Sequence, residues 1–193
     1  VSGSLNYYTN QPQDDDEGAT NRVGFNLSGP IVKDVLSFRI YGSANKTDAD
    51  DANINAAAGN ADAAGVEGVR NKDIAGRLHW KISPAQSLTF DTGFSRQGNI
   101  YNGDTQNSDT HPAAEALRTS LIGSETARLY RSNFALTHTG AWDWGDTKSY
   151  ISYDRTTNSR LPEYLAGGPE GSYSSDEFTN SYLKNLRLSS EAH

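Results

Sequence analysis

The chain has 193 residues, of which 24 are acidic and 17 are basic, so its formal net charge is -7. An acidic chain lacks the basic face that phosphate contacts require, and the composition therefore argues against a nucleic-acid partner. Cysteine is absent, which excludes disulfides, thiolate metal sites and a cysteine nucleophile. The mean hydropathy is -0.70, and no stretch approaches the ~18 consecutive apolar residues of a membrane-spanning helix.

Apolar and polar residues alternate in short blocks along the chain, with the period of two that is typical of β-strands. The alternation predicts eight strands, in chain order at about residues 4–9, 23–27, 36–41, 74–82, 88–95, 133–138, 150–154 and from 186 onward. In the block 74–82, one face is apolar and the other carries Arg77, His79 and Lys81. A packed core does not accept such charges unpaired, whereas a water-filled lumen does.

The connections between these strands alternate in length. Short turns are expected at 29–35, 83–87 and 142–147, and long polar loops at 10–21, 47–73, 98–127 and 160–180. Short turns at one end and long loops at the other are typical of outer-membrane β-barrels. We therefore expect an all-β fold, an antiparallel up-and-down transmembrane β-barrel. A soluble β-sandwich or jelly roll with one solvated face is the alternative that alternation alone leaves open.

Short motifs run in order from one end of the chain to the other. They are GATNR (18–22) with SGP (28–30), SFRIYG (37–42), NKDI (71–74), SRQGNIY (95–101), GDTQN (103–107), RLYR (128–131), and NSRLPE (158–163) followed by two glycines at 167 and 168. On these segments the chain resembles the barrel of the TonB-dependent outer-membrane receptors for ferric catecholate siderophores, and most closely the ferric enterobactin receptors. One such match is a weak signal, but the ordered series is specific.

The resemblance implies that residues 1–193 are the N-terminal part of a receptor barrel, strands about 1 to 8 of about 22, without the plug domain and the remaining strands. It implies the outer membrane of a Gram-negative bacterium as the location. The implied partners are a ferric catecholate siderophore, outer-membrane lipid and, through the missing plug, the TonB complex. Transport requires the plug, so this part alone is expected to be inactive.

The implied ligand is an anionic complex whose iron is already coordinated by catecholate oxygens, so a receptor needs cations and aromatic rings rather than metal ligands. Residues 118–160 hold six basic and four acidic residues in an otherwise acidic chain. By resemblance, the candidate ligand-binding residues are Arg128, Arg131, Arg160, Tyr101 and Tyr130. Strand parity places Arg131 and Arg160 on the inward, polar face. For each arginine, the alternative is a rim charge paired with a neighbour such as Glu125.

Other candidate sites are weaker. The acidic run 14–17 lacks the spaced oxygen ligands and central glycine of a calcium loop, and it is expected to be a solvated loop tip. The four histidines show no metal-ligand spacing, and no nucleophile elbow, phosphate loop or dinucleotide fingerprint occurs. We therefore expect neither an enzyme nor a resident cofactor or metal site, because the iron arrives within the siderophore complex.

Two functions from different classes fit the sequence. The first is a siderophore receptor and transporter that binds its ligand at the extracellular mouth for TonB-energised uptake. The second is a secreted or surface β-structured module for adhesion or carbohydrate binding, in which Tyr and Trp stack on sugars. Recovery of the native full-length protein in the aqueous phase after detergent partition would exclude the barrel.

Overall fold

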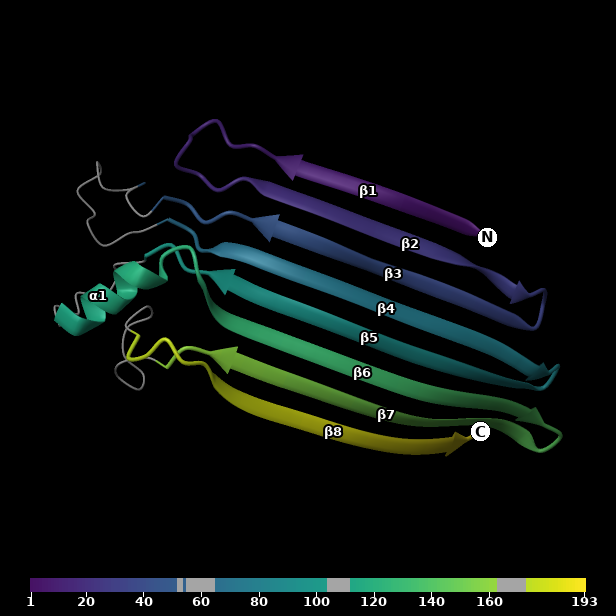
Figure 1. The fold of residues 1–193 in the computed structure, drawn as a ribbon. Helices are drawn as coiled ribbons and strands as arrows, with labels where there is room; N and C mark the ends of the chain where they lie inside the picture. Colours follow the sequence, from purple (N-terminus) through teal and green to yellow (C-terminus); the bar gives the residue numbers. More distant parts are fainter. Residues whose placement is uncertain (52–53, 55–64, 104–111, 163–172) are drawn as a thin grey trace.

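The computed structural model describes residues 1–51, 54, 65–103, 112–162 and 173–193. In this part of the chain, eight strands form one antiparallel sheet whose spatial order is also the order of the sequence (Figure 1). One helix lies between the fifth and sixth strands. The elements are β1 (Ser2–Asn10), β2 (Thr20–Val32), β3 (Leu36–Thr47), β4 (Gly68–Ser83), β5 (Gln86–Ile100), α1 (Pro112–Leu121), β6 (Glu125–Trp142), β7 (Gly145–Arg160) and β8 (Thr179–Ala192).

Every expected strand is present, which confirms the all-β, up-and-down antiparallel fold of a partial barrel. The strands are longer than the alternating blocks that predict them. β6 has 18 residues and β4 has 16, whereas about 9–11 are enough to cross a bilayer. The additional residues are mainly polar and lie next to the long loops, so alternation of hydropathy did not mark them. The expected loops 47–73 and 98–127 are correspondingly shorter, because β4 begins at Gly68 and β5 ends at Ile100.

The sequence prediction contains no helix, and α1 corrects it. A proline at the first helical position and two following alanines, Ala113 and Ala114, favour helix formation within the expected loop 98–127. Pro112 was the signal that would have indicated the helix start. In the part of the chain that the structure describes, no helix is long and apolar enough to cross a membrane.

Cross-strand partners share a face of the sheet, because successive side chains of a strand point to opposite sides. Following the register from strand to strand assigns each residue to one of two faces. The apolar face collects large hydrophobic side chains, among them Ile40, Leu78, Phe90, Leu136 and Ile151. These five side chains remain between 37% and 42% exposed. A continuous apolar surface of this kind requires a non-aqueous environment.

The polar face of the same strands carries charged and hydrogen-bonding groups. Arg77 forms an ion pair with Asp91 at 2.6 Å, and Nδ1 of His79 lies 3.0 Å from the hydroxyl of Thr89. The register confirms that Arg77, His79 and Lys81 share one face. Charges on one face and exposed hydrophobic side chains on the other are the pattern of a wall that separates water from lipid.

Short turns and long loops lie at opposite ends of the sheet, as predicted (Figure 1). The turn end joins β2 to β3, β4 to β5, and β6 to β7, whereas the loop end carries α1 and the longer connections. Trp142 and Trp144 stack at the turn end, with ring centroids 6.5 Å apart. Indole rings at the edge of an apolar band are typical of the membrane interface.

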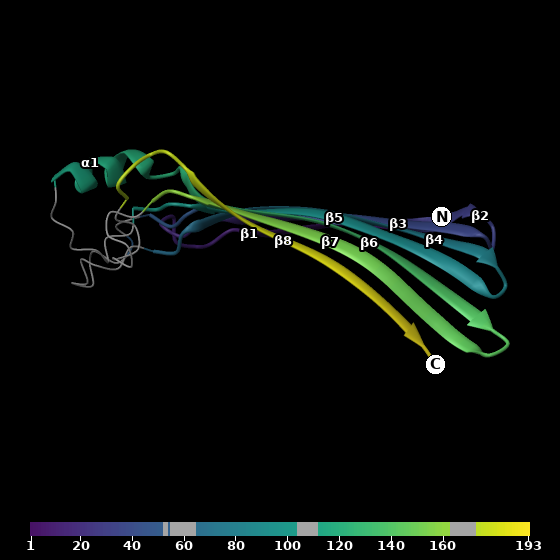
Figure 2. The same ribbon diagram turned by 90° about the horizontal axis from the view of Figure 1, so that it is seen from below.

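The sheet is twisted and open. Figure 2 shows that, as the strands approach the turn end, β6, β7 and β8 curve away from β2 and β3. Among the described residues, pairing runs from β1 to β8, and no pairing joins β8 back to β1. Both edge strands therefore present unpaired backbone groups, and the sheet has the shape of a curved wall rather than a closed barrel.

A small core stabilises the loop end. Tyr101, Leu121, Leu161 and Tyr173 are each at most 8% exposed and pack together. The backbone N–H of Tyr101 donates to the carbonyl of Ser124 at 2.9 Å, which ties the chain after α1 to the end of β5. This core holds the loop end against the strands that carry the candidate arginines.

Residues 1–193 expressed alone are expected to self-associate in aqueous buffer, because both edge strands and the apolar face are unprotected. Size-exclusion chromatography with light scattering after refolding measures this directly. We expect high-mass species in buffer and a smaller protein–detergent particle when a non-ionic detergent is present. A folded, monodisperse monomer in buffer would contradict the assignment of the apolar face to a non-aqueous environment.

Candidate functional site

Two of the predicted arginines, Arg131 and Arg160, lie on the polar face near the loop end. Arg131 on β6 lies opposite Ser95 on β5 and Thr156 on β7. Arg160 is the last residue of β7, and its cross-strand partners are an alanine and a threonine. The register therefore confirms the prediction that both arginines share the polar face.

Arg131 and Arg160 both lie in exposed positions on the polar face. All four cross-strand partners are neutral. One carboxylate, Asp154, lies a diagonal step from Arg131 toward the turn end. Among the described residues, no carboxylate oxygen lies within 4.0 Å of the Arg131 guanidinium. Two such cations on the water-facing side suit an anionic ligand.

Arg128 and Tyr130 lie on the opposite, apolar face, because each is an odd number of residues from Arg131 along β6. Arg128 donates to Glu125 at 2.9 Å, and its guanidinium lies 4.3 Å from the centroid of the Phe178 ring. The structure therefore does not bring Arg128 together with Arg131. For Arg128, the geometry shows the alternative use, a charge paired with Glu125.

Glu125 collects three cations from three strands. Its carboxylate accepts hydrogen bonds from Arg96 on β5 and Arg128 on β6. Nη1 of Arg70 on β4 lies 3.6 Å from its Oε1. The Glu125 side chain is only 9% exposed. A Cβ at Gly98 would lie 3.2 Å from Oε1, so glycine leaves room for the carboxylate between the flanking arginines.

The pKa of Glu125 reflects two opposing effects. Burial alone would raise the pKa, because it removes water from the carboxylate. The hydrogen bonds from Arg96 and Arg128 outweigh burial and lower the pKa below its ordinary value. The carboxylate is therefore charged at neutral pH. It balances part of the positive charge of the three arginines around it.

The two predicted tyrosines also support the loop end. Tyr101 is 1% exposed and packs edge-on against Tyr173, with centroids 5.3 Å apart and rings at 84°. Tyr130 lies under the guanidinium of Arg96, 5.8 Å from the ring centroid. Tyr101 is thus enclosed in the small core, and Tyr130 faces away from Arg131. Neither places its ring beside the polar-face arginines.

Sequence reasoning missed a basic and aromatic pair on the polar face. The guanidinium of Arg39 lies 4.9 Å from the centroid of Tyr41 and donates to Asn26 at 2.9 Å. Its cross-strand partner is Arg77, whose own charge is ion-paired. The signal was present in the alternating block 36–41, because residues two apart on a strand share a face.

Among the described residues, no three histidine, aspartate or glutamate side chains gather as metal ligands. The acidic run 14–17 forms an exposed turn in which the N–H of Asp16 donates to the carboxylate of Asp14 at 3.0 Å. His111 lies outside the described residues.

The features above define a class of protein. An up-and-down antiparallel sheet with one exposed apolar face, one charged face and turns and loops at opposite ends is the wall of an outer-membrane β-barrel. The unpaired edges of β1 and β8 make this sheet a part of such a wall.

Comparison with known proteins identifies the family within that class. No protein-family model matches the chain. A probable TonB-dependent siderophore receptor, PirA of Acinetobacter baumannii, is 51% identical over 192 residues, 99% of this chain and 25% of the relative. The crystal structure of the siderophore receptor PirA from Acinetobacter baumannii matches with a TM-score of 0.88 at 50% identity, over 98% of this chain and 27% of that one. A mutant of the ferric enterobactin receptor PfeA from Pseudomonas aeruginosa, in complex with enterobactin, gives a TM-score of 0.83 at 44% identity, over 98% of this chain and 28% of that one.

By this correspondence of sequence and fold, the chain is homologous over nearly its whole length to one segment of TonB-dependent siderophore receptors, and that segment is part of their outer-membrane barrel. The resemblance indicated by the sequence motifs is thereby confirmed. The chain spans about a quarter of the length of the curated relatives it matches. Those relatives are receptors rather than enzymes.

Glu125→Gln in the full-length receptor is expected to destabilise the loop end, because three arginines lose the charge they share. Hydrogen bonds to charged groups contribute about 1.5–3 kcal/mol each, and we expect a loss of about that size in the free energy of unfolding. Guanidinium unfolding in detergent measures it. The control Glu177→Gln alters an exposed carboxylate at the same end and should change stability by less than about 0.5 kcal/mol.

The loss of stability caused by Glu125→Gln should also depend on pH. A carboxylate with a lowered folded-state pKa stabilises the protein above its unfolded pKa and loses that contribution as the pH falls through the folded value. The difference in the free energy of unfolding between wild type and Glu125→Gln should therefore shrink as the pH falls below 4.5, the ordinary pKa of glutamate. A difference that stays constant down to about pH 3 would contradict the role assigned to this carboxylate.

A matched pair of lysine substitutions tests the two faces. Leu136→Lys places a charge in the middle of the apolar face, and Thr137→Lys makes the same change one residue away on the polar face. We expect Leu136→Lys to cost about 2–4 kcal/mol of stability in lipid vesicles, and Thr137→Lys less than about 1 kcal/mol. Equal costs in equilibrium unfolding would show that the faces are wrongly assigned.

Proposed function

We propose that the chain forms part of the barrel wall of an outer-membrane receptor that binds a ferric catecholate siderophore of the enterobactin type at its extracellular mouth. The observation that carries the proposal is the pair Arg131 and Arg160, two exposed cations that share the polar face at the loop end. A receptor with the same fold over this segment was crystallised with enterobactin, which supports this ligand class.

The chemistry of the ligand explains why arginine suits this position. A ferric catecholate complex presents negatively charged oxygens and aromatic rings around an iron whose coordination is already complete. Guanidinium groups remain charged, donate to oxygens along a planar edge and stack on aromatic faces. The iron is therefore cargo within the ligand, and the proposal requires neither a protein metal ligand nor a resident cofactor.

The predicted residues divide into two groups under this proposal. Arg131 and Arg160 contact the ligand from the polar face. Arg128, Tyr130 and Tyr101 act indirectly, because their contacts with the loop end fix the shape of the mouth. Ligand affinity should respond to the first group directly and to the second group through the stability of the loops.

We also propose that residues 1–193 are the N-terminal part of a barrel of about 22 strands that encloses a plug domain. The open edges of β1 and β8 and the quarter-length match to the relatives support a larger barrel. Uptake would be energised by the TonB complex acting through the plug. The wall itself performs no chemical step, so the protein acts as a receptor and transporter and not as an enzyme.

The double variant Arg131→Ala and Arg160→Ala in the full-length receptor is expected to weaken ferric enterobactin binding. Each charge-assisted contact contributes about 1.5–3 kcal/mol, so we expect about a 10- to 150-fold rise in Kd per arginine. Quenching of tryptophan fluorescence in a titration of the detergent-purified receptor measures the affinity.

Two controls accompany this experiment. Lys148→Ala removes a cation from the same strand and face as Arg160 but near the turn end, and it should leave Kd unchanged. Arg131→Lys with Arg160→Lys keeps both charges and should recover part of the affinity. Wild-type affinity in the alanine double variant, with normal folding and surface expression, would overturn the assignment.

A further inference from the structure

The apolar face carries a set of cations where its hydrophobic band meets the loop end. By register and parity, these residues occupy three successive rows of side chains across β3 to β8. We refer to the whole set, over all three rows, as the basic row. It comprises Lys46, Arg70, Lys72, Arg96, Arg128, Arg155 and Lys184. None of these side chains can reach a siderophore in the lumen, because they lie on the other side of the sheet.

The basic row divides by its ion pairing. Arg70, Arg96 and Arg128 share Glu125, and Lys46 forms an ion pair with Asp48 at 2.5 Å. These cations are accounted for by contacts within the protein.

The remaining three cations of the row are Lys72, Arg155 and Lys184. In the ranges that the structure describes, none of them has a carboxylate oxygen within 4.0 Å. These three cations are therefore not neutralised by any carboxylate of the described residues.

Arg155 and Lys184 lie directly opposite each other on β7 and β8. Like charges in directly opposed positions destabilise a sheet, so an anion between them would relieve an unfavourable contact. Both residues are exposed, and the guanidinium of Arg155 lies 5.4 Å from the centroid of the Tyr182 ring. The pair therefore offers adjacent positive charges to an external group.

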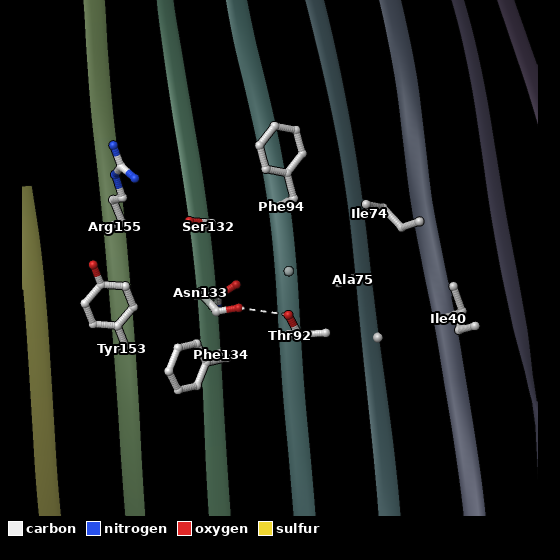
Figure 3. A pocket seen from close by; sticks show the side chains of 12 residues that line it. Ile40, Ile74, Ala75, Thr92, Phe94, Ser132, Asn133, Phe134, Tyr153 and Arg155 are labelled. Atoms are coloured by element: carbon white, nitrogen blue, oxygen red, sulfur yellow. Dashed lines mark hydrogen bonds between the residues drawn. The ribbon is translucent and has the colours of Figure 1, made fainter. Parts of the chain in front are cut away.

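An apolar groove begins beside this pair. It has a volume of about 640 Å³ and is lined by Phe94, Phe134, Tyr153 and Ile74, with Arg155 at its loop-end side (Figure 3). Ser132 and two glycines, at 76 and 93, contribute small side chains or none between the large rings. Phe94 and Phe134 remain 46% and 44% exposed, so the groove is open along its length.

We propose that Arg155 and Lys184 bind the phosphate group of an outer-leaflet lipid whose acyl chain lies in this groove. The pair lies between the hydrophobic band and the extracellular loops, which is the level of the lipid head groups. A phosphate monoester carries up to two negative charges, and it matches two adjacent cations better than a zwitterionic head group does. The groove lies on the hydrocarbon side of the pair, as an attached acyl chain requires.

Native mass spectrometry of the detergent-purified full-length receptor tests this proposal with two probes, phosphorylated lipid A and the same lipid after removal of its phosphates. We expect wild type to retain the phosphorylated lipid about tenfold more strongly than the dephosphorylated one. Arg155→Gln with Lys184→Gln should reduce binding of the phosphorylated lipid to the level of the dephosphorylated lipid.

The matched control is Arg187→Gln, which removes a cation from β8 on the polar face and should leave lipid binding unchanged. Ferric enterobactin affinity should be unchanged in the Arg155 and Lys184 double variant, so this test is independent of the siderophore site. Equal retention of the two lipids by wild type would overturn the proposal even where the double variant fails to assemble. Unchanged lipid binding in a folded double variant would also overturn it, as would displacement of the lipid by inorganic phosphate, which would indicate a simple anion site.

Discussion

The alternation of side chains across one continuous hydrogen-bonded register is the constraint on which the rest of this structure depends. Each strand sends successive residues to opposite sides of the sheet, and the register carries that assignment from β1 to β8. A slip by one residue would turn Leu136 toward water and Arg131 toward lipid. The burial of one face in an apolar medium therefore fixes where every functional charge points. Arginines three positions apart, such as Arg128 and Arg131, acquire different environments for this reason alone.

Cations in this sheet divide according to whether the protein itself neutralises them. Around Glu125, three arginines are held by one nearly buried carboxylate, and the adjacent core of Tyr101 and Tyr173 anchors the loops that follow. Arg131 on the water side and Arg155 on the lipid side lack such a carboxylate among the described residues. The unpaired cations are thus the ones that suit external anions, and the face determines which kind of anion each can meet.

The sequence was sufficient to predict much of the fold and part of the candidate site. Eight strands, their order, the alternation of turns and loops and the shared face of Arg131 and Arg160 follow from a period of two, because the pleat imposes that period directly. Helix α1 and the polar ends of the long strands were missed, because neither carries the contrast of hydropathy that the pattern detects. The pairing of Arg128 with Glu125 was among the alternatives that the sequence offered, because the two residues are three apart on β6. The ring partners of Tyr101 and Tyr130 were not predictable, since they come from a loop and from another strand.

By itself, the sequence determined that the chain is a strand-rich wall with one apolar and one charged face, and its motifs indicated the receptor family. These are local properties, because alternation, turn composition and short motifs each depend on only a few neighbouring residues. Only the tertiary structure decided which cations are paired. Glu125 meets Arg70 and Arg96 only when β4, β5 and β6 are aligned in register, and Arg155 meets Lys184 only when β7 pairs with β8. Charge compensation depends on distances across strands, and those distances exist only in the assembled sheet.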